Sequence, residues 1–337
     1  MNDKIDIIIP WVNGADPEWI KEREDCILKY GAEEKSLSNI RFQSWDNLHY
    51  WFRAIEKFMP WVNKIVFVTW GHVPEFLNTD HPRIRIVKHK DYIPKQYLPT
   101  FNSNTIEMNY HRIEELSENF IIFNDDFFPL KAVDETYYFK NNMVCDEAVE
   151  GHITPVEAGA ISNMARYVQV NNMIIINKHF KKREVQEQNW DKWYCNDYGE
   201  LLERTKSLNY WYDFAGFRDP HLPSAMKKSV LAHLWEVEGV TLDIASRNHF
   251  RAYTDVSQYL IRYWQLCSGE FYPRRTLGKF YQVDIENYKD VARDIEEQKH
   301  QMISINENCS TEDFVIIKKR INEAFETILY EKSEFEK

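Results

Sequence analysis

Residues 119–127, Asn-Phe-Ile-Ile-Phe-Asn-Asp-Asp-Phe, decide the fold class of this chain. The apolar run at 120–123 is followed directly by Asn124, Asp125 and Asp126. Such a run predicts a strand that is buried on both faces, as in a parallel sheet covered by helices. Open α/β sheets bind ligands at the carboxyl ends of their strands, where these carboxylates could hold Mg²⁺ or Mn²⁺ on a diphosphate. A solvated Asp-Asp turn is an equally good interpretation of this segment alone.

Two other predicted strands end in aromatic and polar residues. The strand at 4–9 runs into a loop with Trp11 and Asn13, and the strand at 64–69 runs into a segment that contains His72. Because strands and helices alternate, we expect a parallel sheet that brings these strand ends to one edge. The first loop lacks a G-x-G-x-x-G pattern, so a dinucleotide site of that type is not predicted. Its indole and amide groups could hold a nucleotide base, or they could belong to a packed turn.

The predicted fold class is α/β, with a Rossmann-like (glycosyltransferase-A-like), mostly parallel sheet that has helices on both faces. After about residue 135 the pattern changes to short strands near 136–144 and then to long helical segments. These segments, which make the second half largely helical, are predicted at 163–178, 189–208, 224–237, 256–268, 287–301 and 311–332. We expect two parts, 1–145 and 146–337, that form one continuous catalytic unit.

Composition and charge argue against several classes of protein. The 337 residues are 44% hydrophobic and 28% charged, which is typical of a soluble globular protein, and the net charge of −11 argues against general nucleic-acid binding. Five scattered cysteines favour a reducing compartment. No leader or membrane-length apolar run is visible, so we expect a cytoplasmic protein, with peripheral contact at the inner face of the plasma membrane left open. The apolar stripe of the last helical segment predicts core packing, with a homodimer or membrane contact as the alternative.

Two pairs of charged residues near predicted helices are candidates for binding phosphate or moving protons. Arg41 and Arg53 belong to the unit at 41–59, and guanidinium groups are planar donors for phosphoryl oxygens. Glu107 and His111 lie four residues apart in the helical segment predicted within 98–116, just before the Asp-Asp strand. Solvated helix faces and a structural histidine are the more ordinary interpretations.

Two polar segments in the second half are further candidates. His221 is bracketed by Pro220 and Pro223, so a fixed imidazole there could act as a general acid or base. Arg247 and Arg251 lie four residues apart and could neutralise a transferring phosphate. From spacing alone, a surface turn with solvated arginines is the default interpretation.

Taken together, these segments resemble the Stealth family, the sugar-1-phosphate transferases of microbial capsule synthesis, to which the animal N-acetylglucosamine-1-phosphotransferase of lysosomal enzymes is related. The similarity follows the four conserved regions of that family in order, at 6–17, 41–128, 220–234 and 246–269. Its specific elements include Trp-Val-Asn-Gly-Ala-Asp-Pro at 11–17, His-Arg at 111–112 and Asn-Asp-Asp at 124–126. Asn306-Glu307 stands where relatives have Asn-Asp, and we assign no metal role to Glu307.

The resemblance implies transfer of a sugar 1-phosphate from a UDP-sugar, either a UDP-hexose or a UDP-N-acetylhexosamine, to a hydroxyl of a free or lipid-linked acceptor glycan. The product is a phosphodiester, UMP is released, Mg²⁺ or Mn²⁺ assists, and residues 1–145 bind the nucleotide sugar and the metal. The residues implied are catalytic His221, Arg251, Arg53 and His111; substrate-binding Trp11, Asn13, Gly14, Asp16, Arg41, Glu107, Arg112 and Arg247; and metal-binding Asp125 and Asp126. His221 is the first choice for the base that takes the acceptor's proton, and His111 is the second.

Two other functions are compatible with the same residues. A metal-dependent glycosyltransferase also carries paired carboxylates after a buried strand, but it forms a glycosidic bond and releases UDP. A non-catalytic glycan-binding or scaffold protein would suit the 11 tryptophans, but it needs no Asp-Asp pair together with a fixed histidine and arginines. The nucleotide that is released distinguishes the first alternative, and glycan binding without nucleotide release distinguishes the second.

Overall fold

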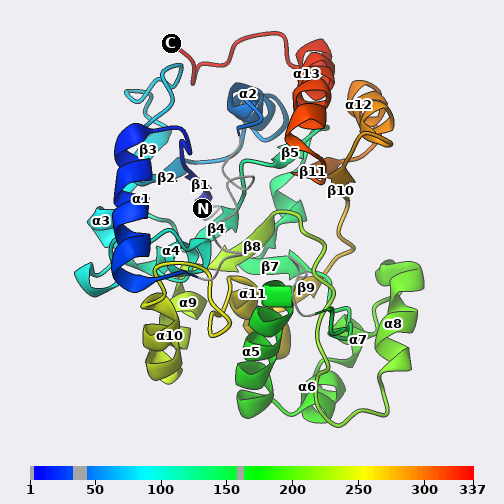
Figure 1. Cartoon of the computed structure of the whole chain (residues 1–337). Helices are drawn as coiled ribbons and strands as arrows, with labels where there is room; N and C mark the ends of the chain where they lie inside the picture. The colour runs from blue at the N-terminus through cyan, green and yellow to red at the C-terminus, as the bar shows by residue number, and fades with distance from the viewer. Residues whose placement is uncertain (1–3, 33–43, 158–162) are drawn as a thin grey trace.

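The fold is built on a five-stranded sheet with the strand order β3-β2-β1-β4-β8 (Figure 1). The computed structural model describes residues 4–32, 44–157 and 163–337. The strands of this sheet are β1 (Ile5–Trp11), β2 (Ile65–Thr69), β3 (Ile84–Lys88), β4 (Asn119–Ile122) and β8 (Ser224–Lys227). Strands β1 to β4 run parallel, and β8 pairs antiparallel with β4. The predicted α/β fold with a mostly parallel sheet is confirmed.

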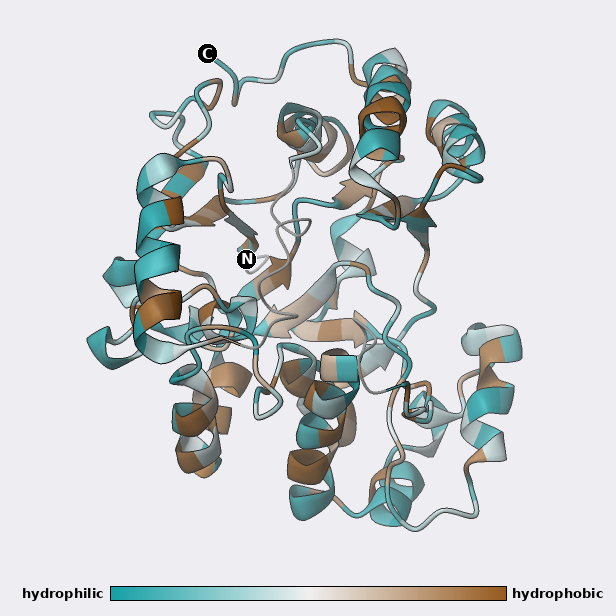
Figure 2. Ribbon diagram, viewed as in Figure 1, coloured by the Kyte–Doolittle hydropathy of each residue, from teal (hydrophilic) through white to brown (hydrophobic). Residues whose placement is uncertain are grey.

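The segment 119–127 lies where its apolar run predicts. β4 is flanked on both sides, because Ile121 pairs with Ile7 of β1 and with Ala225 of β8. Phe120 and Ile121 are 0% exposed, as expected for an apolar strand with both faces covered. Figure 2 shows these central strands as mostly hydrophobic and α1 (Pro17–Tyr30) as largely hydrophilic. The Asn-Asp-Asp segment at 124–126 therefore follows at the carboxyl edge of the sheet.

Helices surround the sheet, with α2 and α13 above it in Figure 1 and α5, α9 and α10 below it. The helices are α1, α2 (Leu48–Phe58), α3 (His89–Tyr92), α4 (Ser103–Glu107), α5 (Asn163–His179), α6 (Lys182–Gln188), α7 (Trp190–Trp193), α8 (Leu202–Ser207), α9 (Lys228–Val237), α10 (Gly239–Ser246), α11 (Tyr259–Cys267), α12 (Tyr288–Glu296) and α13 (Thr311–Ile328). Short 3₁₀ turns are η3 (Lys95–Tyr97), η4 (Tyr110–Arg112), η5 (Glu135–Tyr137) and η6 (Asn196–Leu201). α1 begins directly after Asp16, whose side chain caps it, and ends at Tyr30, with Gly31 as its C-cap.

Two small three-stranded sheets join the halves of the chain, in the orders β10-β11-β5 and β6-β7-β9. Their strands are β5 (Phe127–Pro129), β6 (Phe139–Lys140), β7 (Met143–Asp146), β9 (Phe271–Pro273), β10 (Lys279–Val283) and β11 (Met302–Glu307). Because β5 directly follows Asp126, its antiparallel pairing with β11 brings residues near the C-terminus to the end of β4. The boundary expected between 145 and 146 falls within β7.

The second half is less helical than predicted. Residues 224–227 form β8 instead of the first turn of a helix, and α9 begins at Lys228. Residues 224–227 form a strand because they pair with β4. This tertiary pairing overrides the weak helical preference of a short segment. The segment 189–208 is divided into α7, η6 and α8, with non-helical backbone at Gly199. The core packing of α13 is confirmed, since Phe314, Ile317, Ile321 and Phe325 are buried. Among the described helices, none is long and apolar enough to cross a membrane.

Candidate active site

Two cavities of about 250 Å³ each lie at the carboxyl edge of the main sheet. The lining of the first, which we call the aromatic cavity, includes Trp11, Trp19, His89, Phe101 and Asp125. The lining of the second, the α5 cavity, includes Met164, Val168, Gln169, His221 and Tyr259. Four residues line both cavities, and we call them the shared wall: Ser103, Glu107, Asn124 and Arg251. The edge therefore carries a double site with charged side chains where its halves meet.

Asp125 and Asp126 have different surroundings at the end of β4. Asp125 lines the aromatic cavity and is open to solvent there, yet the surrounding protein raises its pKa to about 7, with further contributions from the charges of Asp126 and Glu307. Asp126 is turned toward β11 and the loop that precedes β8. Its Oδ2 lies 3.3 Å from the Ser304 hydroxyl and 3.7 Å from His221 Nε2. The pair thus supplies one carboxylate to the aromatic cavity and another to the neighbourhood of the histidine.

Glu107 is the buried carboxyl of the shared wall. It ends α4 and is 7% exposed. Burial raises its pKa to about 7, although the positive charges of Arg251 and His221 oppose this rise. The ionised form is therefore costly in the folded protein. Near neutral pH the group can take up or release a proton with little change in free energy.

Arg251 reaches the shared wall because a buried carboxylate fixes its loop. Its Nη2 donates a hydrogen bond to the Ser103 hydroxyl at 2.8 Å. Four residues after Arg251, Asp255 is fully buried and accepts hydrogen bonds from four donors at 2.7–3.0 Å. The donors are the side-chain amides of Asn102, Asn104 and Asn248 and the backbone N–H of Ala252. Burial nevertheless raises the pKa of Asp255. This network joins the Arg251 loop to the start of α4.

His221 is held at the entrance to β8 and lines the α5 cavity. Its φ of 51° is left-handed, a region that histidine adopts more readily than most side chains. The ring packs edge-on against Phe127 and Phe280, with centroids 5.3 and 4.8 Å away. Nε2 lies 3.4 Å from the side-chain nitrogen of Asn306 and 3.7 Å from Asp126 Oδ2. The packing fixes the ring, and the carboxylate can stabilise its protonated form.

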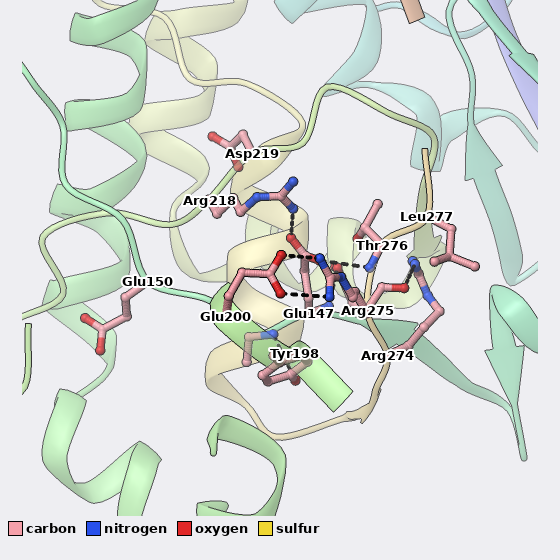
Figure 3. Close-up of polar contacts among 12 residues, drawn as sticks. Glu147, Glu150, Tyr198, Glu200, Arg218, Asp219, Arg274, Arg275, Thr276 and Leu277 are labelled. Carbon is pink, nitrogen blue, oxygen red and sulfur yellow. Dashed lines mark hydrogen bonds and ion pairs between the residues drawn. The ribbon is translucent and has the colours of Figure 1, made fainter. Parts of the chain in front are cut away.

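Buried ion pairs anchor the loop that carries this histidine. Arg218 pairs with the fully buried Glu147, as Figure 3 shows. Arg262 of α11 donates to Asp146 of β7 at 2.7 Å and lies 3.3 Å from an oxygen of Asp219. Arg262 also donates to the backbone carbonyl of Arg218 at 2.9 Å. The two residues that precede the first bracketing proline are therefore fixed by α11 and β7, and this positions the histidine.

The loop after β1 combines one cavity residue with three that shape the turn. Trp11 lines the aromatic cavity and packs against His72, with ring centroids 5.3 Å apart. The backbone N–H of Asn13 donates to His72 Nε2 at 2.8 Å, and Asp16 Oδ2 lies 3.2 Å from Nδ1. Gly14 lies in the turn that the bond from Asp16 N–H to the Asn13 carbonyl closes. The predicted meeting of the β1 and β2 ends is confirmed, while direct substrate contacts of Asn13, Gly14 and Asp16 stay predictions.

The helical segment predicted within 98–116 is interrupted, and this separates Glu107 from His111. α4 ends at Glu107 and the chain continues through η4, so the predicted i, i+4 pairing is wrong. His111 lies beside Trp235, with centroids 5.7 Å apart, and burial lowers its pKa to about 4. Its Nδ1 is buried without a partner. Arg112 packs over the same indole at 4.6 Å. Neither His111 nor Arg112 lines either cavity.

The other predicted arginines are not brought to the cavities. Arg53 of α2 is buried and donates to both carboxylate oxygens of Glu336, at 2.8 and 2.9 Å. Arg247 is exposed and pairs with Asp243 at 2.8 Å. Arg41 lies outside the described residues. Carboxylates elsewhere in the fold pair with Arg53 and Arg247, and neither arginine lines either cavity, so their roles toward a phosphate stay predictions.

The end of β4 offers oxygen donors that fit a divalent cation delivered with a substrate. Within the described ranges, no group of three or more His, Cys, Asp or Glu side chains could hold a metal ion alone. Mg²⁺, however, is commonly held by one or two carboxylates together with substrate phosphates. Asp125 and the neighbouring Asp126 supply such carboxylates. Desolvation raises the pKa of Asp125, and so do the negative charges of Asp126 and Glu307, which a cation would offset.

Several cavity residues were not predicted from the sequence, and three of them carry groups that can hydrogen-bond a substrate. His89 directly follows β3, so the carboxyl end of the third parallel strand was the signal that could have identified it. Gln169 of α5 lines the α5 cavity, where its amide lies 3.4 Å from Asp219. Tyr259 begins α11 and lines the same cavity. No local sequence pattern marks these last two, because their place depends on how α5 and α11 pack.

The chain is similar to known protein families and structures. Two family models match the chain: Stealth protein CR1, conserved region 1, at residues 3–31, and Stealth protein CR2, conserved region 2, at residues 41–147. Among solved structures, the apo structure of the bifunctional glycosyltransferase WbbM aligns with 97% of this chain and 52% of that chain, with a TM-score of 0.33 and 10% identity. The two matched regions contain the loop after β1 and the Asp-Asp segment.

Full-length relatives extend the similarity beyond these regions. The chain is 39% identical over 336 residues to the capsular polysaccharide phosphotransferase WcwK of Streptococcus pneumoniae, covering 99% of this chain and 98% of the relative. It is 34% identical to the exopolysaccharide phosphotransferase cps2G of Lactiplantibacillus plantarum, covering 99% of this chain and 96% of the relative. It is 30% identical to the receptor polysaccharide phosphotransferase WefC of Streptococcus gordonii, with 100% of both covered. With its fold, its site and similarity of this extent, the chain belongs to the Stealth family and is a transferase.

Proposed function

We propose that the protein transfers a sugar 1-phosphate from a UDP-sugar to a hydroxyl of an acceptor glycan, in the synthesis of a capsule or exopolysaccharide. The donor is a UDP-hexose or a UDP-N-acetylhexosamine. The product is a phosphodiester, and UMP is released. Phosphotransferase relatives that act on polysaccharides support this reaction. The five free cysteines support a reducing, cytoplasmic site of action.

The observation that carries this proposal is the pair of cavities that meet at the shared wall. A transferase must hold two substrates with their reacting atoms in contact, and two cavities with four common lining residues suit that task. Arg251 of the wall is a suitable donor for phosphoryl oxygens. The acceptor belongs in the α5 cavity, because His221 lines that cavity.

In the proposed step, the acceptor oxygen attacks the phosphorus that carries the sugar. A new oxygen–phosphorus bond forms, the bridging phosphorus–oxygen bond of the diphosphate breaks, and UMP leaves with that oxygen. Phosphoryl transfer of this kind depends on in-line positioning and charge stabilisation. His221 takes the acceptor's proton at Nε2, where the nearby Asp126 carboxylate at 3.7 Å stabilises the imidazolium. Arg251 stabilises the charge on the transferring group.

Asp125, with Asp126 beside it, would hold Mg²⁺ or Mn²⁺ against the donor's phosphates. The ion would supply positive charge to the diphosphate when it is bound. The protein's own contribution is the placement of a carboxylate in the aromatic cavity, next to the shared wall.

The test is to identify the nucleotide released from a panel of UDP-sugars, with Mg²⁺ or with EDTA, in the presence of a crude lipid-linked glycan acceptor. We expect UMP, released only with metal, and a phosphodiester in the product. The Asp125→Asn variant is the matched control for the metal site. Release of UDP with formation of a glycosidic bond would instead make the protein a metal-dependent glycosyltransferase. Glycan binding without any nucleotide release would refute both reactions.

A further inference from the structure

His89 is a buried imidazole with an unsatisfied nitrogen at the wall of the aromatic cavity. It directly follows β3, lines the cavity and is 8% exposed. Its Nδ1 is enclosed and has no hydrogen-bond partner. Buried polar groups are normally paired, so this ring has unused hydrogen-bonding capacity, and only the part of the ring that lines the cavity can meet a ligand.

The protonation state of this ring constrains the chemistry of a ligand at its cavity edge. Burial lowers the pKa of His89 to about 4, so the imidazole is neutral at physiological pH. A neutral imidazole carries one N–H and one lone pair. Because no partner on Nδ1 fixes the tautomer, the edge of the ring at the cavity can donate or accept a hydrogen bond. Such a group suits the edge of an uncharged heterocycle.

The lining of the cavity combines two kinds of side chain. Trp11, Trp19, Phe101 and the neutral His89 supply aromatic surface, and Trp19 and Phe101 pack edge to face at 5.5 Å. Asp125, Glu107 and Arg251 supply charged groups. A nucleoside diphosphate likewise combines a flat uncharged base with anionic phosphates. Aromatic side chains stack on any nucleobase, so stacking alone does not select one base. Selection requires a polar group that hydrogen-bonds the edge of the base.

We infer that His89 hydrogen-bonds the edge of the donor's nucleobase, which lies against the aromatic side chains of the aromatic cavity. This inference rests on the proposed function, because it assumes a nucleotide donor. It places the base at His89, the diphosphate at Asp125 and Arg251, and the acceptor beyond the shared wall in the α5 cavity.

The experiment compares binding of UMP and of ribose 5-phosphate, which lacks the base, by titration calorimetry in the presence of Mg²⁺. The His89→Phe variant keeps a planar ring without hydrogen-bonding atoms, and His89→Gln keeps a neutral polar edge. His111→Phe is the matched control, because His111 also has a buried, unpartnered Nδ1 and a pKa of about 4 but lies outside both cavities.

Wild-type protein should bind UMP more tightly than ribose 5-phosphate. His89→Phe should weaken UMP binding about tenfold, as for the loss of one buried hydrogen bond, and should change ribose 5-phosphate binding less than about twofold. His89→Gln should stay within about threefold of wild type. Both Phe variants should melt no lower than wild type, because each removes an unsatisfied buried nitrogen. His111→Phe should leave both affinities unchanged.

The outcomes separate this inference from the proposed function. UMP binding by the wild type that His89→Phe leaves unchanged would overturn the role of His89 and leave the proposed donor intact. Equal weakening by His89→Phe and His111→Phe would also overturn it, because the effect would then be structural. A wild-type protein that binds no UMP at all would overturn the proposed donor and this inference with it.

Discussion

Replacing Glu107 with glutamine should stabilise the protein at alkaline pH while impairing its function. Glu107 lies on the shared wall and is 7% exposed. Burial raises its pKa from 4.5 to about 7, so the folded protein carries an unfavourable charge whenever the group is ionised. Glutamine has nearly the same shape and cannot ionise. Its substitution therefore removes the penalty without opening a cavity.

The size of the effect follows from the pKa change. A rise from 4.5 to about 7 corresponds to about 3 kcal/mol of destabilisation once the group is fully ionised. For 337 residues, an unfolding entropy of about 2.1 cal/mol/K per residue gives roughly 0.7 kcal/mol/K for the whole chain. The melting temperature of Glu107→Gln should thus exceed that of wild type by roughly 4 °C when the penalty is complete.

The sign of the pH dependence provides the decisive test. Between about pH 4.5 and 7 the folded protein binds more protons at Glu107 than the unfolded chain does. The contribution of Glu107 to the free energy of unfolding of the wild type therefore falls as the pH rises. Melting temperatures should be measured by calorimetry at pH 5 and pH 8. The melting temperature of Glu107→Gln should exceed that of wild type slightly at pH 5 and by the full amount at pH 8. A gain of equal size at both values, or a loss at pH 8, would refute the reasoning. UMP release by the variant should be slower than by wild type.

Three further substitutions test the assigned roles. Asp125→Asn should abolish metal-dependent UMP release, measured by chromatography of the released nucleotide, without lowering the melting temperature, because it removes a carboxyl whose pKa is raised to about 7. His221→Ala should lower kcat by about 10²–10⁴-fold with a smaller change in the KM of the donor, as for loss of a general base, and an unchanged kcat would exclude that role. Arg53→Ala should reduce the unfolding free energy in urea by about 3 kcal/mol, because it leaves the buried carboxylate of Glu336 without its partner. Its affinity for UMP should match that of wild type, and a large loss of affinity would place Arg53 in the site after all.

The parts of the fold and site that follow from local pattern were predictable from the sequence. The apolar run at 120–123 predicts a buried strand because its neighbours on both sides are apolar, and the acidic pair behind it marks the carboxyl edge. The end of β1 could be placed at the same edge, because parallel strands deliver their carboxyl ends together. Trp11 and Asp125 accordingly line one cavity.

The remaining site residues depend on contacts that no local pattern encodes. Spacing places Glu107 and His111 on one helical face, but the helix ends at Glu107 and the two side chains diverge. Arg53 has a phosphate-binding side chain, but Glu336, which lies 283 residues later, occupies its guanidinium. Gln169 reaches the α5 cavity only through the packing of α5. Such long-range partners are decided by tertiary structure, so the residue types suggested a reaction more reliably than they identified the members of its site.

The charge of the shared wall explains why the proposed reaction should need a cation. Glu107 and Asp125 both have a pKa near 7, so at physiological pH each is ionised in a substantial fraction of molecules. Arg251 is the only arginine or lysine among the described residues that line the two cavities. A diphosphate brought to this wall would meet more negative charge than one guanidinium can offset, and in a partly desolvated site such repulsion is strong. A divalent ion held by Asp125 would convert that carboxylate from a source of repulsion into a ligand. The acidity of the wall is therefore the property that would couple donor binding to the metal.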